Sequence, residues 1–363
     1  MNKKFLYILI IFLTAAAIYA DDNSDFETLL QGTVISEITG DGSGIWAATY
    51  GNGVVYYSFK DQKLTVYSSK NGNLNEDMFY CIAANKDFVW AGSSDGLYTF
   101  DKKRKSWRKR KFGVGGELGN WIRALEYDKW NNVLWVGRFK YLTKLDLDKN
   151  RFADYDLTVN NDVKTNNIKS IALDGERYVW FGTEAGVHLY DKTLDIEDKS
   201  SRTFFAPKAN GFNGDGDAAS VADILIEKNN IWFGLDEFIT SSRPNFNIGG
   251  IYKYNRKAAW ERFDIKRGAS ANGVYCLERT GPAIWAGMYE FDQYRKEPIG
   301  KDLVLINRIT GQVDTIPKED MPLEFEKILS MYFDGNNMWL GTDKGLLKIK
   351  ITNSLASWDV KKK

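Results

Sequence analysis

The chain has 363 residues, and its 49 lysines and arginines are balanced by 48 aspartates and glutamates. This balance lacks the basic excess that nucleic-acid binding requires, so we expect no nucleic-acid partner. Only six prolines are present, and no long polar tract interrupts the sequence, which argues against a disordered linker.

Residues 1–20 have the pattern of an export signal. Two lysines precede an apolar run from Phe5 to Leu13, and small residues up to Ala20 offer a cleavage site. An uncleaved membrane anchor is the alternative, but the apolar run is short for a spanning helix. We therefore expect a periplasmic or secreted protein with no membrane span after cleavage, and residues 21–32 as an N-terminal lead-in.

From residue 33 to residue 360 the chain repeats a pattern centred on tryptophan. Each copy places the tryptophan between two apolar residues and a glycine or alanine two positions later, and consecutive tryptophans are 44 to 54 residues apart. Such a period, with several short strands per unit, is typical of a β-propeller. We predict an all-β fold, a single seven-bladed β-propeller with four-stranded blades, followed by a tail of residues 361–363. The repeat tryptophans are Trp46, Trp90, Trp135, Trp180, Trp232, Trp285 and Trp339.

The tryptophans have a packing explanation. Positions i and i+2 of a strand share a face, so each tryptophan and the small residue after it point to the same neighbouring blade. We expect these tryptophans to fill the wedge between blades and not to stack on a ligand. We also expect pairing of terminal strands to close the ring, with 355–360 as one closing strand, and leave open whether 26–30 adds another.

The repeats resemble those of two-component-regulator propellers. The fourth repeat has Val179-Trp180-Phe181-Gly182-Thr183 followed by Gly186, and the seventh has Met338-Trp339-Leu340-Gly341-Thr342 followed by Gly345. The first, fifth and sixth repeats match the pattern loosely. In that family such propellers usually form the periplasmic sensing half of a membrane histidine kinase. The resemblance implies recognition of a ligand or partner, while no kinase or DNA-binding module is present in this sequence.

Two neighbouring repeats carry insertions between their second and third strands. The third strand begins 19 residues after Trp232 and 18 after Trp285, against seven or eight in the other repeats. These insertions and the long connection 210–219 emerge on the same face of a propeller, which suits a binding site on a rigid scaffold. Weaker candidates for an opposite wall are Trp121, Arg138, Phe139 and Tyr141. The predicted binding residues are Phe238, Arg243, Phe246, Tyr289, Glu290, Phe291, Asp292, Tyr294 and Arg295.

The sequence contains no catalytic motif, so we predict no catalytic residue, cofactor or metal. The 213–217 loop spaces oxygen ligands as a calcium loop does but lacks the later glutamate, and we favour a connecting turn. His188 has no partner for metal chemistry and reads as a packed strand residue. Cys81 and Cys276 are expected to be buried free thiols in separate repeats. The basic run 102–111 reads as a solvated outer strand, with docking to an anionic surface as the alternative.

We therefore expect an exported, non-enzymatic protein that recognises an envelope or extracellular protein, a peptide or a glycan, as an accessory to envelope sensing. Aromatic side chains mixed with charged ones suit such ligands. The alternative is a carbohydrate-active lyase or hydrolase on the same face, using Glu290 and Asp292 with Asp236 or Glu237. A third possibility is a scaffold whose insertions pack on each other and bind nothing.

Overall fold

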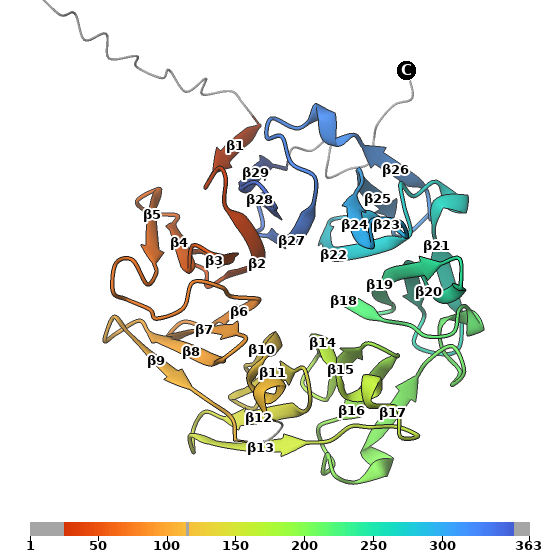
Figure 1. The fold of residues 1–363 in the computed structure, drawn as a ribbon, viewed down its shortest axis with the longest axis horizontal. Coiled ribbons are helices and arrows are strands. Elements are labelled where there is room, and N and C mark those ends of the chain that lie inside the picture. Colours follow the sequence, from red (N-terminus) through yellow and green to blue (C-terminus); the bar gives the residue numbers. More distant parts are fainter. Residues whose placement is uncertain (1–24, 114–115, 352–363) are drawn as a thin grey trace, which may run out of the picture.

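The computed structural model describes residues 25–113 and 116–351. Across these residues seven antiparallel blades surround a central channel, and the first strand of each blade lies innermost (Figure 1). The predicted all-β, seven-bladed propeller is confirmed.

In the first four blades the strands lie in chain order from the centre outward, because short turns join consecutive strands. Blade 1 contains β2 (Val34–Gly40), β3 (Gly44–Tyr50), β4 (Val54–Ser58) and β5 (Lys63–Tyr67). Blade 2 contains β6 (Cys81–Ala84), β7 (Phe88–Ser93), β8 (Gly96–Asp101) and β9 (Ser106–Arg110). Blade 3 contains β10 (Ile122–Asp128), β11 (Val133–Arg138), β12 (Leu142–Asp146) and β13 (Arg151–Tyr155). Blade 4 contains β14 (Ile168–Asp174), β15 (Tyr178–Thr183), β16 (Val187–Asp191) and β17 (Arg202–Phe205).

The last three blades depart from this regular plan. Blade 5 contains β18 (Val221–Ile226), β19 (Ile231–Thr240), β20 (Arg243–Tyr254) and β21 (Trp260–Phe263). Blade 6 contains β22 (Gly273–Thr280), β23 (Ala283–Asp292), the extra β24 (Glu297–Gly300), β25 (Leu303–Asn307) and β26 (Val313–Ile316). Blade 7 contains β27 (Ile328–Phe333), β28 (Asn337–Thr342), β29 (Leu346–Lys350) and β1 (Phe26–Leu29). Short 3₁₀ turns cover Glu117–Asn120, Val163–Asn166, Lys199–Ser201, Phe212–Gly214, Ile265–Arg267 and Lys318–Asp320.

The repeat tryptophans fill the wedges between blades. All seven are at most 2% exposed. The ring centroid of Trp46 lies 5.7 Å from that of Phe100 in blade 2, and Trp339 lies 5.3 Å from Tyr57 in blade 1. The glycine two positions later faces the same neighbour, since a Cβ built on Gly137 would lie 2.7 Å from a methyl carbon of Ile168 in blade 4. The packing role predicted for this motif therefore follows from close approach of consecutive blades.

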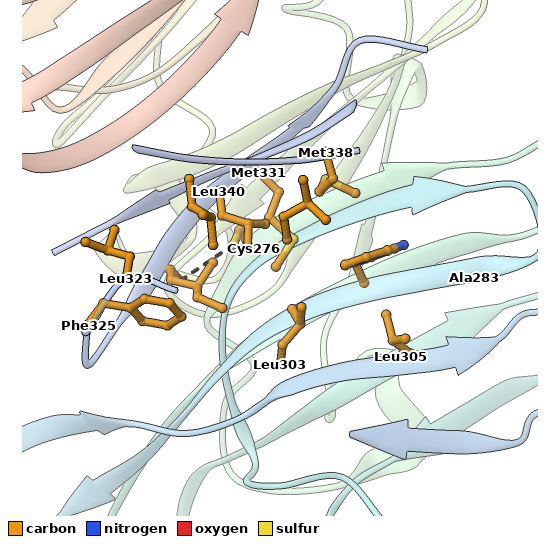
Figure 2. Packing of buried hydrophobic residues seen from close by; sticks show 13 residues of the cluster. Cys276, Ala283, Leu303, Leu305, Leu323, Phe325, Met331, Met338 and Leu340 are labelled. Atoms are coloured by element: carbon orange, nitrogen blue, oxygen red, sulfur yellow. Dashed lines mark hydrogen bonds between the residues drawn. The ribbon is translucent and has the colours of Figure 1, made fainter. Parts of the chain in front are cut away.

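Between blades 6 and 7 the wedge holds one of the hydrophobic clusters (Figure 2). Cys276 packs there among residues such as Met331 and Leu303. Cys81 occupies the corresponding strand of blade 2, and both cysteines are buried free thiols, as the sequence predicts. Burial raises the pKa of both thiols well above the usual value, which suppresses the reactive thiolate.

An N-terminal strand completes blade 7. β1 pairs antiparallel with β29, with Phe26 opposite Ile349 and Leu29 opposite Leu346. The chain thus supplies three strands of this blade from its end and one from its beginning, which closes the ring through hydrogen bonds between distant segments. The predicted closing strand 355–360 and the predicted signal 1–20 lie outside the described residues.

A bulge recurs in the innermost strands. In six blades the pairing of first and second strand shifts by one residue near the start of the first strand. In blades 3, 4 and 6 the residue skipped at the shift is Arg123, Lys169 or Tyr275, and each of these lines the central channel. A bulge re-aims side chains in this way, so it sets which residues reach the channel.

Candidate binding face on blades 5 and 6

The two insertions form β-hairpins that extend their blades, and not the loops expected from the sequence. β19 and β20 continue pairing past the blade, with Phe238 opposite Asn247, and reverse direction at Ser241 and Ser242. In blade 6 the end of β23 pairs with β24, with Tyr289 opposite Gly300. The inserted residues satisfy their own backbone hydrogen bonds as strand pairs, which gives each insertion a defined shape.

Buried polar contacts join the two hairpins. The Tyr289 hydroxyl accepts a hydrogen bond from the backbone N–H of Glu237 at 3.1 Å and donates to Asp236 at 3.2 Å. Glu237 is 4% exposed, and its carboxylate accepts from the Asn272 amide at 3.0 Å and from the Phe291 N–H at 2.8 Å. Burial raises the pKa of Tyr289 well above its usual value. Tyr289, predicted to bind ligand, is therefore an internal link between blades, only 5% exposed.

An aromatic cluster lies where the hairpins meet. The ring centroid of Phe238 is 4.6 Å from that of Phe291 and 6.1 Å from that of Phe246. Two cations flank Phe246: the Arg243 guanidinium carbon lies 3.4 Å from the ring centroid and the Lys164 ammonium 4.6 Å. These side chains line a cavity of about 510 Å³, the inner cavity, whose other lining residues include Lys169, Glu184, Asp236 and Pro298.

A second cavity of about 490 Å³, the outer cavity, lies between the hairpin tips and shares Phe291 with the inner one. Tyr294 lines it and is 89% exposed at the tip of the blade 6 hairpin. Asp292 accepts hydrogen bonds from the N–H groups of Arg295 and Tyr294, and these lower its pKa. Glu290 forms an ion pair with Lys301 at 2.8 Å.

All nine predicted binding residues thus lie on the two hairpins. Five of them line the inner cavity, namely Phe238, Arg243, Phe246, Tyr289 and Phe291. The outer cavity is lined by Glu290, Phe291, Asp292 and Tyr294. Arg295 lines neither cavity and pairs with Asp292 at 3.8 Å. The connection before blade 5 joins the same face, since the N–H groups of Asp217 and Ala218 donate to the carbonyl of Phe246.

The acids of the insertions are engaged in structural contacts. Burial disfavours charge on Asp236, but its ion pair with Lys169 and its hydrogen bond from Ser220 hold its pKa below the usual value. The pKa of Asp292 is lowered as well. A glycosidase general acid requires a raised pKa, so these two carboxylates do not have that property.

Aromatic residues of blades 1 to 3 form a continuous row on the same face as the hairpins. Trp121 stacks on Phe139 with centroids 5.4 Å apart and also contacts Tyr80, which in turn contacts Tyr50. Sequence reasoning included Trp121 and Phe139 but missed Tyr50, which ends β3, and Tyr80, which directly precedes β6.

Two other residues suggested for this opposite wall contact each other in blade 3. Arg138 is fully buried and forms an ion pair with Asp154 at 2.6 Å. The Tyr141 ring packs against the Arg138 guanidinium at 5.6 Å. Arg138 therefore has a structural role inside blade 3.

The central channel collects acids that sequence reasoning also missed. Glu37, Glu126, Asp223 and Glu278 line a cavity of about 440 Å³ at the centre of the ring. Glu37 accepts a hydrogen bond from the N–H of Ile82 in blade 2, and Asp223 accepts one from Leu277 in blade 6. Burial is the main cause that raises the pKa to about 8 for Glu37 and Glu126, about 6 for Asp223 and about 7 for Glu278.

The other residues considered in the sequence make hydrogen bonds within the fold. In the 213–217 loop, Asp215 accepts a hydrogen bond from the Tyr252 hydroxyl at 3.0 Å. His188 is buried, its Nε2 lies 2.8 Å from the carbonyl of Thr165, and burial lowers its pKa to about 4. Among the described residues no group of three or more histidine, cysteine or acidic side chains is arranged to hold a metal ion.

The basic run covers the β8–β9 turn and the outer strand β9 of blade 2, as expected. Lys102 pairs with Asp41 of blade 1, and Lys109 and Lys111 both pair with Asp95 at 2.6 Å. Several of these charges therefore stabilise local structure. Within residues 25–113 and 116–351, no helix is long and apolar enough to cross a membrane.

Comparisons with known proteins agree with this fold. No protein-family model matches the chain. A histidine kinase, P4, of Formosa agariphila is 23% identical over 326 residues, which cover 84% of this chain and 21% of the kinase. The chain thus spans about a fifth of that relative.

Solved structures give the same picture. The extracellular domain of a putative hybrid two-component system from B. thetaiotaomicron has a TM-score of 0.66 at 15% identity, covering 90% of this chain and 40% of that one. Virginiamycin B lyase from Staphylococcus aureus has a TM-score of 0.64 at 13% identity, covering 90% and 99%. At these identities the structures establish the fold alone. The chain is a seven-bladed propeller similar to the extracellular domain of a putative hybrid two-component system, as its repeats indicated.

Proposed function

We propose that this protein is an exported recognition propeller that binds a peptide, protein or glycan through the hairpins of blades 5 and 6. One observation carries the proposal: two adjacent blades extend paired strands beyond an otherwise regular ring and present Phe238, Phe291 and the exposed Tyr294 around two cavities. Loops and extensions on a rigid scaffold are where binding residues concentrate. Export is supported by the N-terminal pattern and the likeness to extracellular domains.

Several features favour binding over catalysis. The inner cavity is walled by phenylalanine rings, and its acids are held by neighbouring donors. The alternative is cleavage of a polysaccharide by a lyase or hydrolase activity on the same face, and it predicts a product that disappears in Glu290→Ala or Asp292→Ala.

Affinity capture from envelope extract tests the proposal. The bait proteins are the wild type, a Phe238→Ala/Tyr294→Ala variant, and an Ile309→Ala control whose side chain is 73% exposed in the β25–β26 turn of blade 6. We expect a partner that the wild type and the control retain and the hairpin variant loses. Equal capture by all three proteins moves the interface away from the hairpins and contradicts the proposal.

A further inference from the structure

Two cations at the inner cavity have no acidic partner among the described residues. Lys164 belongs to the 3₁₀ turn Val163–Asn166 before blade 4, and Arg243 begins β20 of blade 5. Both lie against Phe246, with the Arg243 guanidinium and the Lys164 ammonium 3.4 and 4.6 Å from the ring centroid. A ring face attracts a cation but leaves its N–H groups available to an anion.

The acids of the same cavity are already neutralised or buried. Glu184 pairs with Arg123 at 2.7 Å and accepts from Asn167 at 3.1 Å, while Asp236 pairs with Lys169. Glu237 is 4% exposed and accepts two hydrogen bonds from blade 6. The charge left accessible to a ligand is therefore positive.

The apolar part of the cavity wall is formed by phenylalanine and proline side chains, whereas the polar Ser220 and Asn247 of the lining are buried. Phe238 meets Phe246 at an interplanar angle of 81° and Phe291 at 49°, so the rings do not form a flat platform for a sugar. Pro298 adds a further apolar surface. Phenylalanine and proline side chains have no hydrogen-bonding groups for sugar hydroxyls. An aliphatic or aromatic side chain fits this wall better than a glycan does.

We propose that the inner cavity binds an acidic peptide segment. A carboxylate of the peptide pairs with the Arg243 guanidinium, the Lys164 ammonium adds positive charge beside the same ring, and an adjacent apolar side chain packs against the phenylalanine rings. Guanidinium–carboxylate hydrogen bonds are among the strongest polar contacts in proteins, which makes this position specific for the anion. The inference rests on the proposed function, because it uses the same hairpins, and it adds the chemical class of the ligand.

Fluorescence anisotropy tests the inference with a set of labelled pentapeptides in which one aspartate adjoins Leu, Phe or Val. The matching set carries asparagine in place of aspartate. The proteins are the wild type, Lys164→Gln/Arg243→Gln, and Lys103→Gln/Lys105→Gln, which removes the same positive charge from the exposed β8–β9 turn of blade 2. We expect the acidic set to bind the wild type and the blade 2 control alike, and to bind the cavity variant about tenfold more weakly.

Four results overturn the inference. The first three are that the acidic set does not bind, that the asparagine set binds equally well, and that the blade 2 control is weakened as much as the cavity variant. The fourth is that dextran sulfate, an anionic glycan tested in the same assay, binds while the peptides do not. Each of them leaves the hairpin-dependent capture of a partner unaffected, so failure of this inference and failure of the proposed function are distinguishable. If both variants unfold thermally with the same midpoint as the wild type, a folding defect is excluded as the cause of weaker binding.

Discussion

At the scale of the residue, an aspartate at the turn between the first and second strands joins two blades. Asp174 accepts a hydrogen bond from the indole of Trp180 at 3.1 Å and two from Arg256 of blade 5 at 2.5 and 2.9 Å. Asp41 has the same arrangement with Trp46 and with Lys102 of blade 2. The turn acid thus connects the packing tryptophan to the following blade.

Asp174→Asn is expected to lower the free energy of unfolding by about 2 kcal/mol, because it removes a partly buried, charged hydrogen-bond acceptor from Arg256. The Asp174 side chain is 13% exposed and that of Arg256 is 27% exposed. Urea denaturation checks the change. Glu176→Gln is the matched control, since Glu176 lies exposed in the same turn, and an equal effect in both variants contradicts the role assigned to Asp174.

At the scale of the element, each insertion is a hairpin whose buried base and exposed tip have different roles. Tyr289 lies at the base, where its hydroxyl joins blade 6 to Asp236 and Glu237 of blade 5. Tyr294 lies at the tip and is almost wholly exposed. The sequence assigns these two tyrosines to the same surface, and the strand pairing separates them.

Tyr289→Ala is expected to destabilise the fold by about 3 kcal/mol, because a buried aromatic ring and its hydrogen bonds are lost. Tyr294→Ala is expected to change stability by no more than about 0.5 kcal/mol, as surface substitutions do. Thermal and urea unfolding of both variants measure the difference. Equal stability of the two variants contradicts the internal position of Tyr289.

A second element-scale prediction concerns β1. Removing it exposes the backbone hydrogen-bonding edge of β29, which favours pairing between molecules. A chain that begins at Thr33 is therefore expected to unfold at lower urea concentration and to self-associate, whereas a chain that begins at Asp25 is expected to stay monodisperse. Light scattering after size exclusion and urea denaturation test this. A stable monomer without β1 shows that ring closure does not depend on this strand.

At the scale of the whole molecule, the seven first strands bring distant acids to one channel. The raised pKa values of Glu37, Glu126 and Glu278 arise mainly from burial. The charge of Asp223 raises the pKa of Glu37 and Glu278 further, and because these residues belong to different blades, that interaction exists only when the ring is closed.

These pKa values predict that stability falls as pH rises. The folded values of about 7 to 8 exceed the ordinary carboxyl value of about 4, so the unfolded chain releases these protons first. Their contribution is full below about pH 4 and lost as pH rises through about 8. His188, whose pKa is lowered from 6.5 to about 4, acts in the opposite direction below about pH 6.5, so the carboxyl effect is best isolated above that pH.

Glu126→Gln is therefore expected to flatten the decline of unfolding free energy between about pH 6.5 and 8. Urea denaturation at a series of pH values measures this slope, with Glu176→Gln as the exposed control. The same slope in wild type and Glu126→Gln contradicts the raised pKa of Glu126.

Much of the fold is predictable because the repeat is local in sequence. A tryptophan and a small residue two positions later require a partner blade on one face, and that requirement recurs seven times. The hairpin positions were predictable for a related reason, since an altered distance between Trp232 and the next strand marks an insertion. It was not predictable that the insertions form strands, because the inserted residues pair with one another and not with strands that the repeat pattern marks.

The sequence by itself determined the number of blades, the packing role of the tryptophans and the face on which the insertions emerge, since all three follow from repeat spacing and strand alternation. Only the tertiary structure decided that Tyr289 is buried, that Lys164 and Arg243 meet at Phe246, and that β1 completes blade 7. These contacts join residues from different blades or opposite ends of the chain. Their geometry depends on bulges, strand register and ring closure, which no local pattern specifies.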